Sequence, residues 1–511
     1  MGLENIREVL GAGDEWVSRN VEEGTSRRRL VLYVPKGLCI PRKLGMVIVD
    51  MSSAVRLLPS ADYAQTGLAI CQLLERNILN RLMDGYFIEG IPGTIVIAVD
   101  RPDMSTLARR YLHQKRYPKV KPGAEYNKQK YAVHTNGRKY PKDSLPITTE
   151  QAKALGFGPC PPIKNIVSSG LGRVVLAALF MQYLHRKAKM DSAINPYKRT
   201  HMIFMTPKID GATPFATGEV CCSGMCNGFC KDIPSTYGEV DMMIPGILNA
   251  AYAANVISNR RHALVHANKD GDNAVVITSL REEVADCVFW HRGRQKMILV
   301  GSIEARELQF RYPTPEERKN KKTRYTEAEE LVDMWWLRRY LGRTSNSDPT
   351  YCADSFLSRA SLLFMMGSDY VEKPACVAKN ALLRAFISGK CGPFAMEADS
   401  ADGSPVVAIK RGAFLDTIRY ATTFGVRVKP PIKQDEFLDL SAKILYALSY
   451  YTGQDATTNG PECQRYGWHS IDEAGGASVV VYNASLSSIG EEWADLTTTG
   501  TPEGDALLLF S

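Results

Sequence analysis

The segment MVIVDM, residues 46–51, is a run of apolar and mostly β-branched side chains that contains Asp50 near its end. A second segment of the same kind, GTIVIAVD at 93–100, ends in Asp100. Continuous apolar runs of this length are typical of strands in parallel sheets, because both faces of such sheets are covered. Between them, residues 66–87 carry apolar side chains at helical spacing. The sequence therefore predicts a β-α-β unit and an α/β fold, with a central, mostly parallel sheet flanked by helices.

The same spacing rules predict further elements along the chain. Strands are expected at 201–207, 274–279, 477–484 and 506–510, and helices at 171–187, 237–257, 331–341, 361–366 and 436–451. The charged segment at 313–330 is expected to be an exposed insertion or linker. We predict a core over residues 1–390, with a basic insertion at about 101–200, and an α+β extension of unknown role over 391–511.

Composition limits the class of protein. The 511 residues are enough for two or more domains, and 45% hydrophobic with 23% charged residues is ordinary for a globular chain. The most apolar stretch, 171–190, carries Arg173 and ends in a basic cluster, which favours a buried or amphipathic helix over a membrane span. The N-terminus carries no secretory pattern, and Ile6 stands where myristoylation requires Ser or Thr. We therefore expect an intracellular protein of the nucleus or cytoplasm, neither secreted nor attached to a membrane.

The twelve cysteines are scattered, except for one cluster, CCSGMCNGFC. Thiolates at this spacing are able to wrap a zinc ion, but no second Cys or His pair follows at the spacing of a zinc finger. The alternatives are a zinc site and a small loop of reduced thiols, and the second is favoured. The residues concerned are Cys221, Cys222, Cys226 and Cys230.

A strongly basic segment runs from Arg109 to Lys142, with eleven lysines or arginines against one acid, Glu125. Five tyrosines are interleaved with these cations. Cations bind phosphates and aromatic rings stack on unpaired bases, so the mixture favours a nucleic-acid partner. The alternative is a solvated loop, which blocks of one charge often form.

Several carboxylates are expected at one edge of the sheet. Ligands of open α/β sheets bind at the carboxyl ends of the strands, where Asp50 and Asp100 stand. Glu239, Asp241 and Asp369 stand at expected helix starts that could face the same edge. A single such acid is more often a helix cap, but clustered carboxylates stay ionised only when cations hold them. The set favours Mg²⁺ or Mn²⁺ and hydrolysis of a phosphodiester bond.

The order of these motifs resembles the flap endonucleases and their relatives, the XPG-type structure-specific 5′ nucleases with a PIN-like core. The matching segments are MGLENIREVL, VIVDMSSAV, IAVDRPDMSTLARRYLHQKR, YGEVDMM and LLFMMGSDYVEKP, spread over about 370 residues. The last 120 or so residues match nothing in that family. The chain looks more like the diverged versions of large DNA viruses than like the cellular enzymes. The resemblance implies a PIN-like nuclease core that cleaves branched or flapped DNA in replication, repair or recombination, at the viral replication site if the chain is viral.

The resemblance also implies roles for individual residues. Two metal ions would be held by Asp50, Asp100, Glu239, Asp241, Glu282 and Asp369. The cations of a helical arch that grip the scissile phosphate would be Arg109, Arg110, Lys115 and Arg116. Further contacts with nucleic acid would come from Gly2, Lys119, Lys121, Lys128, Lys130, Arg138 and Lys139.

Two departures from the family pattern keep a second hypothesis open. Where the family has an Asp-x-Asp pair, the segment TSLREE has Leu280 and Glu282; Glu282 or Glu283 could serve as a substitute, but one ligand of the second metal is replaced by leucine. The glycine-rich hairpin that follows the Gly-x-Asp-Tyr motif in the family is also missing. The alternative is a pseudo-nuclease that keeps nucleic-acid binding or a scaffold role without catalysis.

Overall fold

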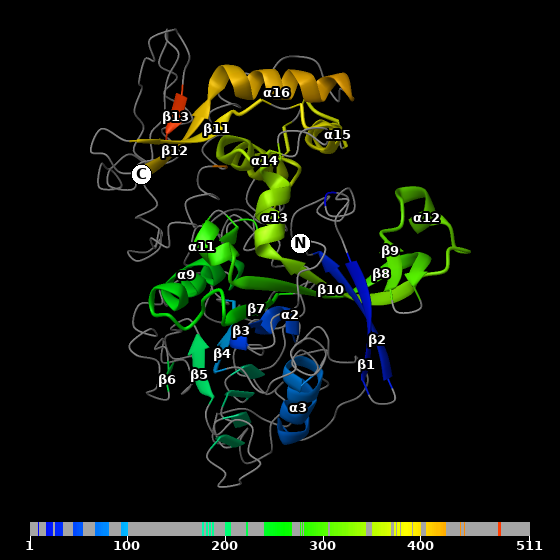
Figure 1. Cartoon of the computed structure of the whole chain (residues 1–511), viewed down its shortest axis with the longest axis vertical. Coiled ribbons are helices and arrows are strands. Elements are labelled where there is room, and N and C mark those ends of the chain that lie inside the picture. Colours follow the sequence, from blue (N-terminus) through cyan, green and yellow to red (C-terminus); the bar gives the residue numbers. More distant parts are fainter. Residues whose placement is uncertain are drawn as a thin grey trace, which may run out of the picture. The chain divides into compact units, whose positions relative to one another are not determined.

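The structure is a computed structural model of the whole chain, shown in Figure 1. The residues that it describes are 9, 17–23, 26–33, 44–54, 67–80, 93–100, 176–177, 180–181, 183–184, 187–188, 200–205, 221–222, 240–267, 276, 278–279, 281–304, 307–343, 350–368, 373–374, 376–378, 380–390, 392–399, 405–425, 440, 444 and 479–481.

The chain divides into two compact units that do not follow one another along the sequence. The first unit comprises residues 1–14, 275–282 and 335–511, and the second comprises 15–274 and 283–334. The expected boundary between 390 and 391 stays a prediction.

The second unit is built on a ten-stranded sheet, drawn from blue to green in Figure 1. Its strand order is β1-β2-β10-β8-β7-β3-β4-β5-β6, and β9 pairs with β8 beside this path. Neighbours are parallel throughout β8-β7-β3-β4-β5, which confirms the predicted α/β class and the mostly parallel centre of the sheet. The strands are β1 (Val17–Glu23), β2 (Ser26–Tyr33), β3 (Leu44–Asp50), β4 (Thr94–Ala98), β5 (His201–Met205), β6 (Cys221–Cys222), β7 (His262–His266), β8 (Val288–Glu304), β9 (Glu307–Arg311) and β10 (Thr326–Asp333).

Burial explains why the central strands were recognisable in the sequence. Every residue of β3 and β4 is buried, as expected for strands covered on both faces. Helix α9 (Val240–Ala253), the short helix α2 (Met51–Ala54), α3 (Gly67–Leu74) and the π-helix η2 (Glu75–Asn80) belong to the same unit. These elements confirm the predicted helices at 66–87 and 237–257 and the strand at 201–207. Described residues within 171–187 are also helical, and Leu176, Ala177, Phe180 and Leu184 are fully buried.

One predicted element was wrong, and another begins later than predicted. Residues 274–279 were expected to form a strand, but Val276 and Thr278 are helical. The periodicity of a short apolar run does not distinguish a strand from a buried helical turn. The high strand propensity of these residues therefore led to a wrong prediction. The strand of this region is β7, which ends eight residues before position 274. The helix expected at 331–341 begins later, as α13 (Met334–Leu341), because Leu331, Val332 and Asp333 complete strand β10.

The segment at 313–330 is only partly the exposed linker that its charge predicts. Residues 316, 318–322, 324 and 325 are exposed, in agreement with the prediction. However, α12 (Pro315–Lys319) is a regular helical turn, and residues from Thr326 onward form β10 inside the main sheet. Glu330, near the end of the segment, is completely buried. The segment is therefore an ordered connection between two strands.

The first unit is α+β. Its described elements are α13, α14 (Ala353–Met365), α15 (Ala381–Ser388), α16 (Arg411–Thr423) and an antiparallel sheet of β11 (Ala395–Asp399), β12 (Pro405–Lys410) and β13 (Val479–Val481). Helix α14 confirms the predicted buried helix ahead of Asp369, and β13 lies within the strand predicted at 477–484. Residues 440 and 444 are helical, as predicted for 436–451, and the strand predicted at 506–510 lies outside the described residues.

Buried arginines join the helices of this unit. The guanidinium of Arg338 lies 4.7 Å from the ring centroid of Phe356 and donates a 2.8 Å hydrogen bond to the carbonyl oxygen of Ser279. The guanidinium of Arg359 lies 4.0 Å from the ring of Phe386 and donates to that residue's carbonyl oxygen. Each charge is thus placed against an aromatic face and a backbone acceptor, which offsets the cost of its burial.

Gly45 in β3 marks a close approach of two backbone segments. A Cβ atom at this position would lie 2.6 Å from the carbonyl oxygen of Val256, which is too close for carbon. We expect Gly45→Ala to lower the free energy of unfolding by about 1–3 kcal/mol, because strand and loop must shift apart. Gly93→Ala, where the nearest atom would be 3.3 Å away, is the matched control and should cost less. Denaturant unfolding of both variants measures this, and equal losses would contradict it.

Candidate functional site

Asp50 stands at the carboxyl end of β3 and caps the helix that follows. Its Oδ1 accepts a 2.8 Å hydrogen bond from the backbone N–H of Ser52, and its Oδ2 accepts a 2.5 Å hydrogen bond from the hydroxyl of Ser53. Only 6% of the residue is exposed. Hydrogen bonds to a carboxylate favour its ionised form and fix its orientation. Asp50 therefore is a helix cap and a rigidly held acid at the same time.

Asp100 joins the end of β4 to the start of α9. Its Oδ1 accepts a 3.0 Å hydrogen bond from the backbone N–H of Val240, the first residue of α9. The positive end of the helix dipole favours a carboxylate there. Asp241 follows Val240 directly, in the first turn of the same helix. The structure thus brings the end of β4 to the predicted acidic helix start, 140 residues further along the chain.

The two strand-end acids share one edge of the sheet. Strands β3 and β4 are parallel neighbours in which Asp50 lies opposite Ala98, two residues before Asp100. This register confirms that the carboxyl ends of the two strands coincide, as the sequence predicted. Asp50, Asp100 and Asp241 all lie in the second unit.

Strand β7 delivers its carboxyl end to the same edge. It is the parallel neighbour of β3, with His266 opposite Val49, and the hydroxyl of Ser53 donates a 2.9 Å hydrogen bond to the carbonyl oxygen of Ala267. The chain is therefore fixed next to Asp50 at residue 267. In the sequence, Lys269 is followed by Asp270, Gly271 and Asp272. These two aspartates lie outside the described residues; in the sequence they follow Ala267 by three and five residues.

This acid pair was not among the predicted ligands, because a strand was expected at 274–279. With β7 at His262–His266, the first acids after the strand are Asp270 and Asp272, not Glu282. The signal that could have identified them is HALVH, three apolar residues between two histidines, followed after three more residues by a glycine between two aspartates.

A pair of buried histidines lies beneath this edge. The Nδ1 atoms of His266 and His291 are 2.8 Å apart, and the rings stack at 5.1 Å between centroids. The residues face each other on β7 and β8, and at most 4% of either is exposed. Because one nitrogen must donate and the other accept, the two rings share one proton at this contact. Sequence reasoning gave these histidines no role.

A second buried polar cluster holds α3 and η2 to the helical residues at 176–188. Glu75 accepts a 2.5 Å hydrogen bond from the hydroxyl of Tyr183 and bonds of 2.7 and 2.9 Å from the ammonium of Lys187. Burial, together with the charge of Glu75, raises the pKa of the Cys71 thiol to about 12. Burial and the hydrogen bond to Glu75 also raise the pKa of Tyr183. Cys71 is therefore a neutral core thiol, and the cluster stabilises helix packing.

Of the remaining predicted ligands, the structure describes Glu282, which belongs to the first unit. The side chain of Glu282 is 66% exposed and its carboxylate lies 3.7 Å from the guanidinium of Arg338. Leu280, Glu239 and Asp369 lie outside the described residues, as do Gly2, Cys226, Cys230 and the whole basic segment from Arg109 to Lys142. Cys221 and Cys222 form β6, antiparallel to β5. Their zinc site, and the roles of all these residues, stay predictions.

Neither a complete metal-ligand set nor a membrane span is found in the part of the chain that the structure describes. Within it, no group of three or more His, Cys, Asp or Glu side chains is arranged to hold a metal ion. Within the same residues, no helix is long and apolar enough to cross a membrane. No protein-family model matches the chain, and no curated protein matches it.

Proposed function

We propose that this chain is a divergent metal-dependent nuclease that hydrolyses phosphodiester bonds in branched or flapped DNA, with a PIN-like core like that of the flap endonucleases. One observation carries the proposal. Asp50 and Asp100 stand at the coincident carboxyl ends of two parallel strands, each held in place by the N–H groups of a helix start. Ligand sites of α/β sheets form at such edges.

The acids present fit a hard cation in their chemistry. Asp50, Asp100, Asp241, Asp270 and Asp272 offer carboxylate oxygens, which Mg²⁺ and Mn²⁺ prefer, and the proposed set adds Glu239 and Asp369 from the family resemblance. When bound, such ions supply an activated water and stabilise the leaving oxygen. The protein's own part would be to hold the acids rigidly and to bind the phosphate backbone with the basic segment at 109–142.

The pseudo-nuclease hypothesis is favoured by one observation. If Glu282 is the acid that replaces the family's aspartates, its carboxylate already lies next to Arg338, and Leu280 supplies no ligand. In that case the nucleic-acid surface persists without catalysis. The two hypotheses differ in whether cleavage requires a metal and whether cleavage occurs at all.

Cleavage of end-labelled DNA tests the proposal. Wild-type protein, Asp100→Asn and the control Asp416→Asn would be incubated with 5′-flap, nicked and single-stranded DNA in Mg²⁺, Mn²⁺ or EDTA. Asp416 is exposed on α16 and pairs with Arg419, so its variant should behave as wild type. We expect cleavage that needs metal and that falls at least a hundredfold in Asp100→Asn. Binding without cleavage by wild type in every buffer would instead establish the pseudo-nuclease.

A further inference from the structure

The connection between β9 and β10 carries an exposed group of cations that the proposed site does not use. Between residues 311 and 325 there are six Lys or Arg and two Glu, a formal net charge of +4. Four of these cations lie within six consecutive residues, and all four are exposed. We call them the basic turn: Lys319, Lys321, Lys322 and Arg324.

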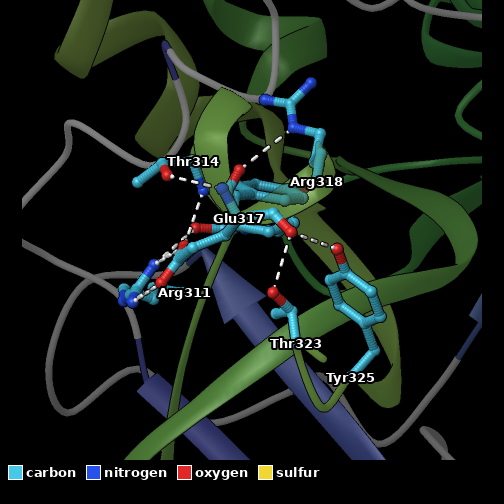
Figure 2. Close-up of polar contacts among 8 residues, drawn as sticks. Arg311, Thr314, Glu317, Arg318, Thr323 and Tyr325 are labelled. Atoms are coloured by element: carbon cyan, nitrogen blue, oxygen red, sulfur yellow. Dashed lines mark hydrogen bonds and ion pairs between the residues drawn. The ribbon is translucent and has the colours of Figure 1, made fainter. Parts of the chain in front are cut away.

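Hydrogen bonds among residues that flank or adjoin the basic turn fix its backbone, and Figure 2 shows those that involve Thr314, Glu317, Thr323 and Tyr325. Thr314 and Glu317 form a reciprocal capping box at the start of α12. The hydroxyls of Thr323 and Tyr325 donate hydrogen bonds of 2.8 and 2.9 Å to the carbonyl oxygen of Glu317. Past the helix, the backbone N–H of Lys322 donates to Oδ1 of Asn320. The backbone that displays the cations is thus fixed on both sides of the turn.

Glu317 is held by Arg311 and Thr314, and among the described residues none of the hydrogen bonds to its carboxylate comes from the basic turn. Both oxygens of Glu317 accept hydrogen bonds from Arg311, at 2.7 and 2.6 Å, and one of them also accepts the capping bond from Thr314. The hydrogen bond from Arg311 holds the pKa of Glu317 down to about 2. Within the described segment 311–325, Glu316 is the other acid, and its carboxylate interacts electrostatically with Lys319, so the segment keeps an excess of cations.

A fixed group of exposed cations suits a polyanion. Phosphates repeat along a nucleic-acid backbone, so several adjacent cations bind it together, and prior ordering lowers the entropy cost of binding. In strand order, β8 and β7 separate β10, where the turn ends, from β3 with Asp50. The turn is therefore distinct from the strand-end acids.

We propose that the basic turn is a second, sequence-independent contact for the phosphate backbone of duplex DNA. This proposal depends on the proposed function in one respect, which is that both assume DNA as the partner. Catalysis is not needed for this contact, so it is testable without metal.

Binding measured in EDTA tests the contact apart from cleavage. Fluorescence anisotropy would give the Kd of the full chain for a labelled duplex between 50 and 250 mM KCl. The variants are Lys321→Ala/Lys322→Ala and the replacement of all four cations by alanine. The control is Arg260→Ala/Arg261→Ala. It removes two exposed cations just before β7, at the amino ends of the parallel strands.

We expect the fourfold variant to bind on the order of tenfold more weakly at 100 mM KCl, with a salt slope reduced by about 3, and the double variant to lose about half as much. Wild-type affinity and slope in the fourfold variant would overturn the proposal, and so would equal losses in the two double variants. Selective loss of binding to vesicles of phosphatidylserine, with duplex binding unchanged, would assign the turn to a membrane surface instead. The cleavage assay tests the nuclease proposal separately, because absence of metal-dependent cleavage would contradict that proposal alone.

Discussion

Asp270→Asn and Asp272→Asn are each expected to reduce metal-dependent DNA cleavage on the order of a thousandfold, whereas Glu282→Gln should leave it within about twofold. A metal ligand contributes several kcal/mol to the transition state, and asparagine keeps the size of aspartate while removing its charge. The contrast decides which acids complete the proposed site.

Position in the sequence relative to β7 favours the aspartates over the glutamate. Ala267 is hydrogen bonded to Ser53, which also holds Asp50, and Asp270 follows three residues later in the chain. Glu282 instead begins helix α11 (Glu282–Ala285) with its side chain mostly exposed and near Arg338. Neutralising Glu282 should therefore change cleavage little, because this acid is exposed to solvent and already lies beside an arginine.

The measurement is single-turnover cleavage of a 5′-flap substrate in Mg²⁺, beside duplex binding in EDTA. Unchanged binding shows that a variant is folded and that any loss is catalytic. If Glu282→Gln abolished cleavage while both aspartate variants cleaved normally, the alignment with Glu282 would be right and the acids after β7 would have no catalytic role.

The strands and helices that were predicted correctly have a regular hydrophobic pattern, either continuous or at helical spacing. Strands β3 and β4 are buried on both faces and read as continuous apolar runs. Helices α9 and α14 place buried side chains at helical spacing. The position of Asp50 and Asp100 at one edge followed from these strands alone, because parallel neighbours end together.

Strand β7 escaped detection because its composition is mixed. HALVH has only three apolar residues between two histidines, and two arginines precede it. Its burial comes from its neighbours: it lies between β3 and β8, and His266 finds a partner in His291. Tertiary contacts of this kind override local propensity and are invisible in a single sequence. Missing β7 also displaced the predicted acid pair by ten residues.

Strands β8 and β10 were missed for a related reason, since their buried residues include charged ones. Arg292 and Glu330 read as surface positions, yet 1% and none of their surface is exposed. They come from strands paired across the sheet, and only the fold brings them together. A charged pattern therefore concealed two of the most buried residues in the unit.

Breaking this buried pair is expected to destabilise the protein by about 3–5 kcal/mol. Nη1 of Arg292 lies 2.7 Å from Oε2 of Glu330 and donates a 2.9 Å hydrogen bond to the hydroxyl of Tyr312, which in turn donates to Glu330. The guanidinium also lies 4.8 Å from the ring of Trp290. Arg292→Met leaves the Glu330 carboxylate buried without its cation, and Glu330→Leu leaves the guanidinium without its anion. Either uncompensated charge costs far more than the pair itself contributes.

The double variant Arg292→Met/Glu330→Leu is therefore expected to recover most of the stability that each single variant loses, because apolar side chains of similar size need no partner. Denaturant unfolding of wild type, both single variants and the double variant gives the coupling energy directly. Asp416→Asn, which breaks the exposed pair with Arg419, serves as the surface control and should change little. Losses that simply add in the double variant would show that the two residues stabilise β8 and β10 independently, through packing and not through their charges.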